Sequence, residues 1–364
     1  MNIAEYWGFS GRGVTIWCPF PSGKHPETDK VQVESTKWAT RYGLCQGGED
    51  SNALNLGGSM GLCLPFARFE SLLAVACYSQ WGFLWDSYLD DLAADPVALG
   101  LHVAEAVRVA REPCAAPVPD DKWLQSLRDC FRLMEGCFGP TDMYRQRAEG
   151  FAWYTGQMWK GMLQNRSQPP TVAEFLRMRL NKSGMVMAIP YTAAASGHSL
   201  TDEEYCDIAV QAFAEATVLS IVIANEVISL PKEIIVGNAK LNLVQIVARE
   251  RGIGVAEAAG AVWELYERMV CFVRRRQKAL LADPRLNVAR LAVELPFWIS
   301  GGLEFMIRSA RYVGESVIGR DAMPRVTMVS EEPVFWSQRD HTAPPYPDIA
   351  WWWRTEQTAA TAFR

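Results

Sequence analysis

Apolar residues recur at every third or fourth position along most of the chain from residue 63 onwards. This period puts the apolar side chains of each segment on one helix face, unlike the strict alternation of a half-buried strand. We therefore predict helices over 63–93, 100–111, 121–136, 141–164, 172–196, 202–231, 240–250, 255–282 and 286–312. The chain shows no regular change between strand and helix patterns, so the predicted fold class is all-α, a helical bundle.

The two ends of the chain lack the helical period. Residues 1–30 are rich in Gly, Pro and Ser, which predicts a loop-rich head. Residues from about 321 to 364 return to irregular sequence that includes Pro344-Pro345, so we expect an irregular tail. A chain of this length is within the range of one large domain, and the prediction is a single domain over residues 1–364.

Composition narrows the class of protein without choosing a function. Of 364 residues, 49% are apolar and 21% are charged, as in ordinary soluble proteins, and the net charge of −5 provides no basic surface for nucleic acid. No apolar stretch approaches the ~18 residues of a membrane span, and the N-terminus lacks a secretory leader pattern. The nine cysteines include no Cys-x-x-Cys pair, which favours reduced thiols. We expect a cytoplasmic protein.

The segment 83–91, FLWDSYLDD, runs from bulky apolar residues into a group of aspartates. On a helix Asp86 and Asp90 share one face, whereas Asp91 points about 140° away from Asp86. Two carboxylates four positions apart repel each other mildly unless a cation lies near them. One interpretation is a helix end that emerges into solvent. The aromatic residues before Asp86 favour the other, in which the carboxylates lie in partly apolar surroundings and need a cation.

A second polar group lies in ANEVISLPKE, residues 224–233, directly after an apolar stretch. Asn225, Ser229 and Glu233 follow one another at four-residue spacing, so their oxygens drift by only about 80° around an ideal helix. Amide, hydroxyl and carboxylate oxygens are hard ligands that suit Mg²⁺ or Mn²⁺. Lys232 lies on the same stripe. A chance polar stripe is the alternative, but a polar triple that emerges from a buried helix needs a partner.

These two segments resemble the metal-binding pair of class I terpene synthases of the microbial type. That family has an aspartate-rich motif, D-D-x-x-D/E, on one helix and N-x-x-x-S-x-x-x-E on a facing helix, and the second motif is complete here. Arg179, 46 positions before Asn225, resembles the family's diphosphate-sensing arginine. Arg311-Tyr312 resembles its C-terminal Arg-Tyr pair. The resemblance covers about 18–312 in colinear order.

The resemblance implies an α-helical bundle with a central apolar cavity, and three Mg²⁺ ions bound with the substrate diphosphate at the cavity mouth. It implies a lyase that breaks the carbon–oxygen bond of an isoprenyl diphosphate, with Mn²⁺ as an alternative metal. Metal ions and basic side chains would neutralise the leaving diphosphate, and a dry pocket would keep the carbocation from water. The implied metal ligands are Asp86, Asn225, Ser229 and Glu233. The implied diphosphate-binding residues are Arg179, Lys232, Arg311 and Tyr312.

Aromatic residues are candidates for the cavity wall. Trp298, Phe305 and Tyr312 recur every seven residues and form one stripe on the expected helix 286–312. Core packing alone produces such stripes, but this one ends at the Arg-Tyr pair. We therefore count it, with Phe83 one turn before the aspartates, among the substrate-binding residues, because an aromatic face stabilises a cation by roughly 0.5–2 kcal/mol. For both members of the Arg-Tyr pair to reach diphosphate, either the long arginine side chain must reach around the helix, or the helix must end or bend near them.

Ser87 occupies the position of the family's second aspartate, so the motif here is D-S-x-x-D-D. The resemblance assigns the first aspartate as the direct ligand, and Asp86 keeps that position. Asp90 and Asp91 are expected to support the site by pairing with Arg or Lys when it closes.

Small residues leave the chain length of the substrate open. Lys182 and Ser183 follow the sensor arginine where relatives commonly carry an acidic residue and a small one, and we expect Ser183 to contact substrate. Helix spacing also directs Gly82 and Ala188 toward the expected cavity. A roomy cavity favours the C20 geranylgeranyl diphosphate, whereas the C15 farnesyl diphosphate is commoner in the family.

The function predicted is therefore a Mg²⁺-dependent terpene cyclase that converts a linear isoprenyl diphosphate to a terpene hydrocarbon or alcohol plus diphosphate. A chain-elongating isoprenyl diphosphate synthase is one alternative, but it generally needs two aspartate-rich motifs and only one is present. A non-catalytic helical scaffold with polar surface stripes is the other. The sequence leaves the oligomeric state open, with a homodimer as one alternative.

Overall fold

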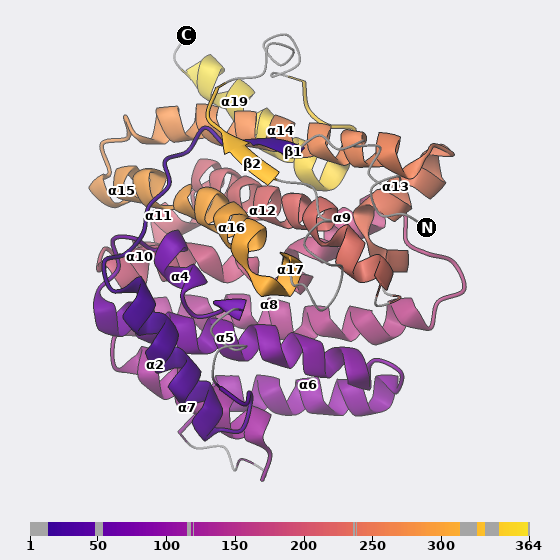
Figure 1. Ribbon diagram of the computed structural model, residues 1–364. Coiled ribbons are helices and arrows are strands. Elements are labelled where there is room, and N and C mark those ends of the chain that lie inside the picture. The colour runs from indigo at the N-terminus through magenta and orange to yellow at the C-terminus, as the bar shows by residue number, and fades with distance from the viewer. Residues whose placement is uncertain are drawn as a thin grey trace. The chain divides into compact units, whose positions relative to one another are not determined.

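The computed structural model describes residues 14–47, 54–114, 118, 120–235, 237, 239–313, 326–331 and 342–362 (Figure 1). These residues form helices almost throughout, and the all-α prediction is confirmed. They divide into two compact units. Unit 1 comprises residues 1–21, 169–179 and 200–364, and unit 2 comprises residues 22–168 and 180–199. The prediction of a single domain stays a prediction.

Unit 2 is built around α5, a helix with buried side chains on several sides. Its elements are α2 (Thr28–Arg41), α4 (Ser59–Cys63), α5 (Phe69–Leu92), α6 (Pro96–Arg111), α7 (Lys122–Glu135), α8 (Pro140–Gln164), the 3₁₀ turn η1 (Met185–Met187) and α10 (Ala188–Ser196). The other α-helices of this unit all contact α5. On α5 the Trp81 and Trp85 rings stack with centroids 4.8 Å apart. This aromatic core fixes the helix that ends in the aspartate motif.

Unit 1 is built around α12, which is apolar over most of its length. Its elements are β1 (Val14–Trp17), α9 (Val172–Lys182, up to Arg179), α11 (Asp202–Cys206), α12 (Ile208–Ile235), the 3₁₀ turn η2 (Ala239–Leu241), α13 (Leu243–Arg251), α14 (Val255–Leu280), α15 (Leu286–Glu294), α16 (Phe297–Arg308), α17 (Ala310–Val313), β2 (Val326–Val329) and α19 (Pro347–Ala362). Helices α13, α14, α16 and α19 pack on α12. A Cβ atom at Gly302 of α16 would lie 2.9 Å from Ile221 Cγ2 of α12. The absence of a side chain at Gly302 therefore permits α16 to approach α12 this closely.

By length and composition alone, α12 could cross a membrane, but 72% of its most apolar window is buried inside the protein. Buried core helices meet the same criteria of length and apolar composition. The burial of α12 identifies it as the core helix of unit 1.

Within the described residues, parts of the head and tail of the chain form regular elements that the sequence did not predict. Strands β1 and β2 pair in parallel, with Val14 opposite Val326 and Trp17 opposite Val329. The Tyr266 hydroxyl of α14 donates to the Trp17 carbonyl at 3.0 Å, which ties β1 to the helical core. The prediction of an irregular tail is wrong for residues 326–329 and for α19.

Helix α19 forms because its tryptophans have a core to pack on. Trp352 and Trp353 are buried, and the Trp353 ring lies 4.8 Å from that of Phe272 on α14. The Trp352 indole donates to Glu215 Oε2 on α12 at 3.0 Å. Burial of large aromatic rings outweighs the irregular composition of the flanking sequence.

The expected long helix 286–312 is divided into three. Helix α15 ends before Pro296, which has no backbone N–H to continue the helical ladder. Helix α16 ends at Arg308 because Ser309 adopts an extended backbone, with ψ of 134°. The short α17 then carries Arg311 and Tyr312. The helix therefore ends before this pair, which was one of the two alternatives left open by the sequence.

Glu267 of α14 makes the stability of the fold depend on pH. Burial, with a smaller contribution from Glu264, raises the pKa of Glu267 to about 7. The folded state therefore holds the proton more tightly than the unfolded chain. The free energy of unfolding should fall as pH rises from about 4.5 to above 7.

We expect Glu267→Gln to stabilise the fold at pH 8 by about 1–2 kcal/mol, after allowance for partial solvent screening, and to have little effect at pH 4. Urea unfolding followed by circular dichroism at both pH values measures this difference. Glu257→Gln, at an exposed position of the same helix, is the matched control. An equal effect of Glu267→Gln at both pH values would contradict the raised pKa.

Candidate active site

Three polar residues follow one face of α12, as the spacing predicted. The helix continues through Pro231 to Ile235, so Asn225, Ser229 and Glu233 lie on successive turns. The Ser229 hydroxyl donates to Glu233 Oε1 at 2.7 Å. Two of the three oxygen-bearing groups are therefore already in contact in the folded helix.

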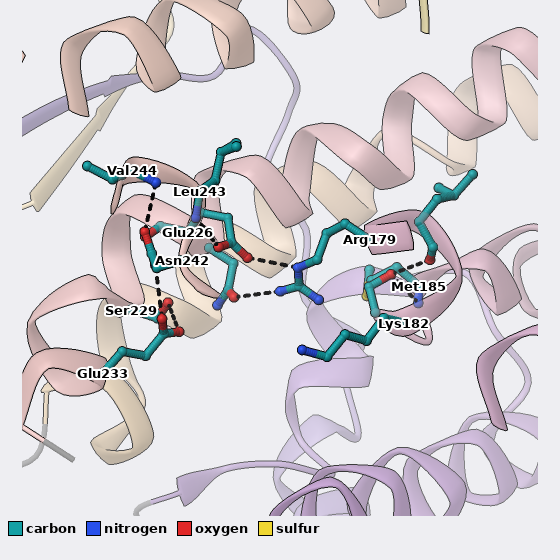
Figure 2. A network of polar contacts seen from close by, with 12 residues as sticks. Arg179, Lys182, Met185, Glu226, Ser229, Glu233, Asn242, Leu243 and Val244 are labelled. Atoms are coloured by element: carbon teal, nitrogen blue, oxygen red, sulfur yellow. Dashed lines mark hydrogen bonds and ion pairs between the residues drawn. The ribbon is translucent and has the colours of Figure 1, made fainter. Parts of the chain in front are cut away.

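Arg179 of α9 connects to this stripe through a buried carboxylate. Its Nε lies 2.8 Å from Glu226 Oε1, and its Nη2 donates to Asn225 Oδ1 at 3.3 Å. The side chains of Glu226 and Arg179 are 4% and 17% exposed, so each charge is largely removed from water and needs the other. Figure 2 shows the Arg179 side chain pointing toward Glu226.

Asn242 holds the other side of the network. Its Oδ1 accepts from the Val244 amide and caps the start of α13. Its Nδ2 donates to Glu233 Oε2 at 3.0 Å and to the Glu226 carbonyl at 2.7 Å. The same amide group thus joins the last turns of α12, through Glu226 and Glu233, to the start of α13 (Figure 2).

The sequence analysis did not identify Glu226 or Asn242. A charged residue inside the apolar run of α12 was one available signal, because a buried charge needs a partner. An asparagine directly before a helical apolar run was another, since that is a preferred N-cap pattern.

The electrostatics around Glu233 favour a cation. Burial raises the pKa of Glu233, and the nearby Glu226 carboxylate raises it further. Hydrogen bonds from Ser229 and Asn242, together with the Arg179 charge, oppose this rise only in part. A divalent cation at Glu233 would offset the remaining cost of the carboxylate charge.

The donor set fits a hard cation. Asn225, Ser229 and Glu233 offer an amide, a hydroxyl and a carboxylate oxygen, the ligand types of Mg²⁺ and Mn²⁺. Within the described part of the chain, no group of three or more His, Cys, Asp or Glu side chains is placed to hold a metal ion. A metal site on α12 therefore depends on the asparagine and serine oxygens.

The Arg-Tyr pair lies near the same network. The Ser309 hydroxyl accepts from the Arg311 amide at 3.2 Å and starts α17. Burial raises the pKa of Tyr312, and Arg311, Arg179 and Asn225 are close enough to oppose that rise. The Tyr312 phenol therefore remains a hydrogen-bond donor at neutral pH.

The predicted aromatic wall of unit 1 is buried. The Tyr312 ring meets the Phe305 ring edge-on, with centroids 5.8 Å apart. Trp298 and Phe305 are both buried, and Lys232 is half-buried beside Pro231. Their contact with substrate stays a prediction.

In unit 2 the aspartates pair with a lysine that the sequence analysis missed. Lys160 of α8 places its Nζ 2.7 Å from Asp86 Oδ1 and 2.8 Å from Asp90 Oδ1. It also donates to the Asp86 carbonyl at 2.7 Å. Asp91 is exposed, and the expected pairing of Asp90 and Asp91 with Arg or Lys on closure of the site stays a prediction.

Ser87 and Ser183 use their hydroxyls locally. Ser87 donates to the carbonyl of the half-buried Phe83 at 3.2 Å, one turn earlier on α5. Ser183 donates to the Leu180 carbonyl at 2.8 Å and accepts from the Met185 amide at 3.1 Å. A role for Phe83 or Ser183 in substrate binding stays a prediction.

Gly82 lies close to an aromatic ring of unit 2. A Cβ atom there would lie 2.9 Å from the Trp153 ring, so glycine permits this close packing. The expectation that Gly82 faces a substrate cavity stays a prediction.

Curated relatives match nearly the whole chain. Bonnadiene synthase from Allokutzneria albata is 26% identical over 93% of this chain and 96% of its own. Diterpene cyclase DtcycA from a Streptomyces species is 26% identical over 93% and 95%. The 4-epi-cubebol synthase of Streptosporangium roseum, described as (2E,6E)-farnesyl diphosphate cyclizing, is 24% identical over 81% and 90%.

A solved structure has the same fold. The crystal structure of the SVS_A2 protein from ancestral sequence reconstruction aligns with a TM-score of 0.75 at 22% identity, covering 93% of this chain and 98% of that one. Residues 77–270 match the family described as terpene synthase family 2, C-terminal metal binding. That span includes Asp86, Arg179 and the polar stripe of α12, and it is more than half of the chain. The protein belongs to terpene synthase family 2.

Proposed function

We propose that this terpene synthase is a Mg²⁺-dependent class I cyclase that ionises and cyclises farnesyl (C15) or geranylgeranyl (C20) diphosphate. The observation that carries the proposal is the network of unit 1, in which Arg179 joins Asn225 and Glu226 beside Ser229 and Glu233. It combines hard oxygen ligands with a guanidinium, the two groups that a diphosphate–metal complex requires.

The protein residues have separate roles in this proposal. Asn225, Ser229 and Glu233 would hold metal on α12, and Asp86 would do so on α5. Bound Mg²⁺ would neutralise the diphosphate charge and favour departure of the leaving group. Arg179 and Arg311 would donate hydrogen bonds to diphosphate oxygens, and the protonated Tyr312 would add another.

The reactive carbocation would then meet apolar surroundings. Phe83, Trp298 and Phe305 are the candidate aromatic faces, each worth roughly 0.5–2 kcal/mol to a cation. Among the candidate residues no side chain is an evident general base, so the released diphosphate would take the final proton, or water would capture the cation. We propose a cytoplasmic enzyme.

The relatives support both chain lengths. One relative's name specifies farnesyl diphosphate, and another's describes a diterpene cyclase. Chain elongation is not favoured, because only one aspartate-rich motif is present. A non-catalytic scaffold is not favoured, because it would not explain why the charged side chains of Arg179 and Glu226 are buried together on α9 and α12.

Incubation of the purified protein with C10, C15 and C20 all-trans diphosphates tests the function. With Mg²⁺ we expect diphosphate release and a volatile or extractable cyclic product from C15 or C20, and no product when EDTA removes the metal. Gas chromatography with mass spectrometry identifies the product. Absence of diphosphate release from every substrate, with Mg²⁺ and with Mn²⁺, would refute the proposal.

A further inference from the structure

The aspartate motif of α5 already holds a cation supplied by the protein itself. Lys160 Nζ has three close acceptors, namely Asp86 Oδ1 at 2.7 Å, Asp90 Oδ1 at 2.8 Å and the Asp86 carbonyl at 2.7 Å. An ammonium group has three protons, so these contacts satisfy it completely.

Burial distinguishes the lysine from the aspartates it contacts. The Lys160 side chain is 5% exposed, whereas those of Asp86 and Asp90 are 33% and 40% exposed. The ammonium therefore approaches the motif from inside the protein, and the carboxylates remain accessible from solvent. A soluble cation and Lys160 would meet the same carboxylates from different sides.

We propose that Lys160 is a resident counter-cation that competes with divalent metal ions for Asp86 and Asp90. In this role it keeps the metal affinity of the motif low until a diphosphate is present. The inference rests on the proposed function, because it assigns the aspartates to a metal–diphosphate site. Lys160 acts through the aspartates and is a positioning residue.

The charges give the physical reason. Asp86 and Asp90 carry two negative charges and Lys160 carries one positive charge, so the group has a net charge of −1. Ser87, on the same turn, adds no charge and donates its hydroxyl to the helix backbone. A metal ion that binds without diphosphate therefore meets two carboxylates whose charge is half neutralised, and it is repelled by the Lys160 ammonium. A metal ion that arrives as a complex with diphosphate brings negative charge with it, and this charge offsets the repulsion between the metal ion and the Lys160 ammonium.

A purely structural role is the alternative. Lys160 would then serve only to attach α8 to α5, and its removal would leave metal affinity unchanged or lower it through loss of the aspartate geometry. If Lys160 competes with metal ions, its removal should instead raise the metal affinity of the motif. Metal binding measured without substrate therefore distinguishes the two roles.

The experiment titrates Mn²⁺ into the full-length protein without substrate and measures free Mn²⁺ by electron paramagnetic resonance. We expect Lys160→Met to lower the Kd for Mn²⁺ by about tenfold or more, since a unit charge within ~4 Å interacts strongly at an effective dielectric constant of about 20. Lys160→Arg keeps the charge and should bind within about threefold of the wild type. Lys24→Met removes an exposed lysine that pairs with Asp29 and is the matched control.

A second substitution shows where the extra metal binds. Adding Asp86→Asn to Lys160→Met should cancel the gain in affinity. An unchanged or weaker Mn²⁺ affinity in folded Lys160→Met protein would overturn the proposal, and so would a gain that survives Asp86→Asn. If Lys160→Met fails to fold by circular dichroism, Lys160→Gln, which keeps hydrogen-bond donors, is judged by the same criteria.

The result is separate from the test of the proposed function. If wild-type protein converts none of the isoprenyl diphosphates but Lys160→Met binds Mn²⁺ more tightly, the proposed function fails and the competition stands. If wild-type protein is active and Lys160→Met has unchanged metal affinity, the competition fails and the proposed function stands.

Discussion

Asn225→Ala is expected to lower kcat/KM for the isoprenyl diphosphate by at least about 10²-fold, the scale of removing one preorganised group from a charge-stabilising site. Two effects combine at this residue. The variant would lose an oxygen from the proposed metal-binding stripe of α12. It would also lose the acceptor that Arg179 Nη2 contacts at 3.3 Å. Diphosphate release at saturating Mg²⁺ measures the effect.

Asp86→Asn tests the corresponding position in unit 2 and should also abolish product formation, because an amide is a much weaker metal ligand than a carboxylate. Asn165→Ala, at an exposed asparagine that ends α8, is the control for loss of an amide and should retain activity within about twofold. Circular dichroism establishes that each variant is folded. Full turnover by both Asn225→Ala and Asp86→Asn would remove these residues from the site.

Local periodicity was sufficient to predict the two helices that carry the candidate metal ligands. A four-residue spacing on a helix determines a shared face whatever the tertiary structure, and for this reason Asn225, Ser229 and Glu233 could be grouped before their helix was seen. The same reasoning placed Asp86 and Asp90 together on α5.

Partners from distant segments could not be predicted in this way. Lys160 lies 74 positions from Asp86, and Glu226 lies 47 positions from Arg179. Each contact depends on how two helices pack, and helix period contains no information about that packing. A buried charge shows that a partner exists, but the sequence alone does not identify it.

The errors at the C-terminal end have a related cause. The apolar period across 286–312 suggested one helix, because periodicity averages over a single break such as Ser309. The tail was predicted to be irregular from its composition, yet Trp352 and Trp353 are buried where α19 packs on α12 and on Phe272 of α14. Tertiary burial decided the structure of this segment, and local preference did not.

Glu226→Gln is the substitution with the largest expected effect on stability. The carboxylate accepts from Arg179 Nε at 2.8 Å and from the Leu243 amide at 3.0 Å, and it is almost completely buried. Glutamine has nearly the same shape but no charge, so Arg179 Nε would lose its carboxylate partner at 2.8 Å while the guanidinium stays largely buried. We expect the free energy of unfolding to fall by about 2–4 kcal/mol. Glu257→Gln on α14 is exposed and should change it by less than about 0.5 kcal/mol.

A double-mutant cycle separates the ion pair from general damage to α12. Arg179→Gln should also be destabilising. The double variant with Glu226→Gln should be more stable than the sum of the single effects implies, by about 1–3 kcal/mol, because the same ion pair is lost in both single variants and can be lost only once. Urea unfolding of the four proteins measures this coupling energy. Strictly additive effects would show that Glu226 supports the helix end through Leu243 alone. Arg179 would then be held in place by other contacts, and the buried carboxylate would have no part in orienting the guanidinium toward a diphosphate.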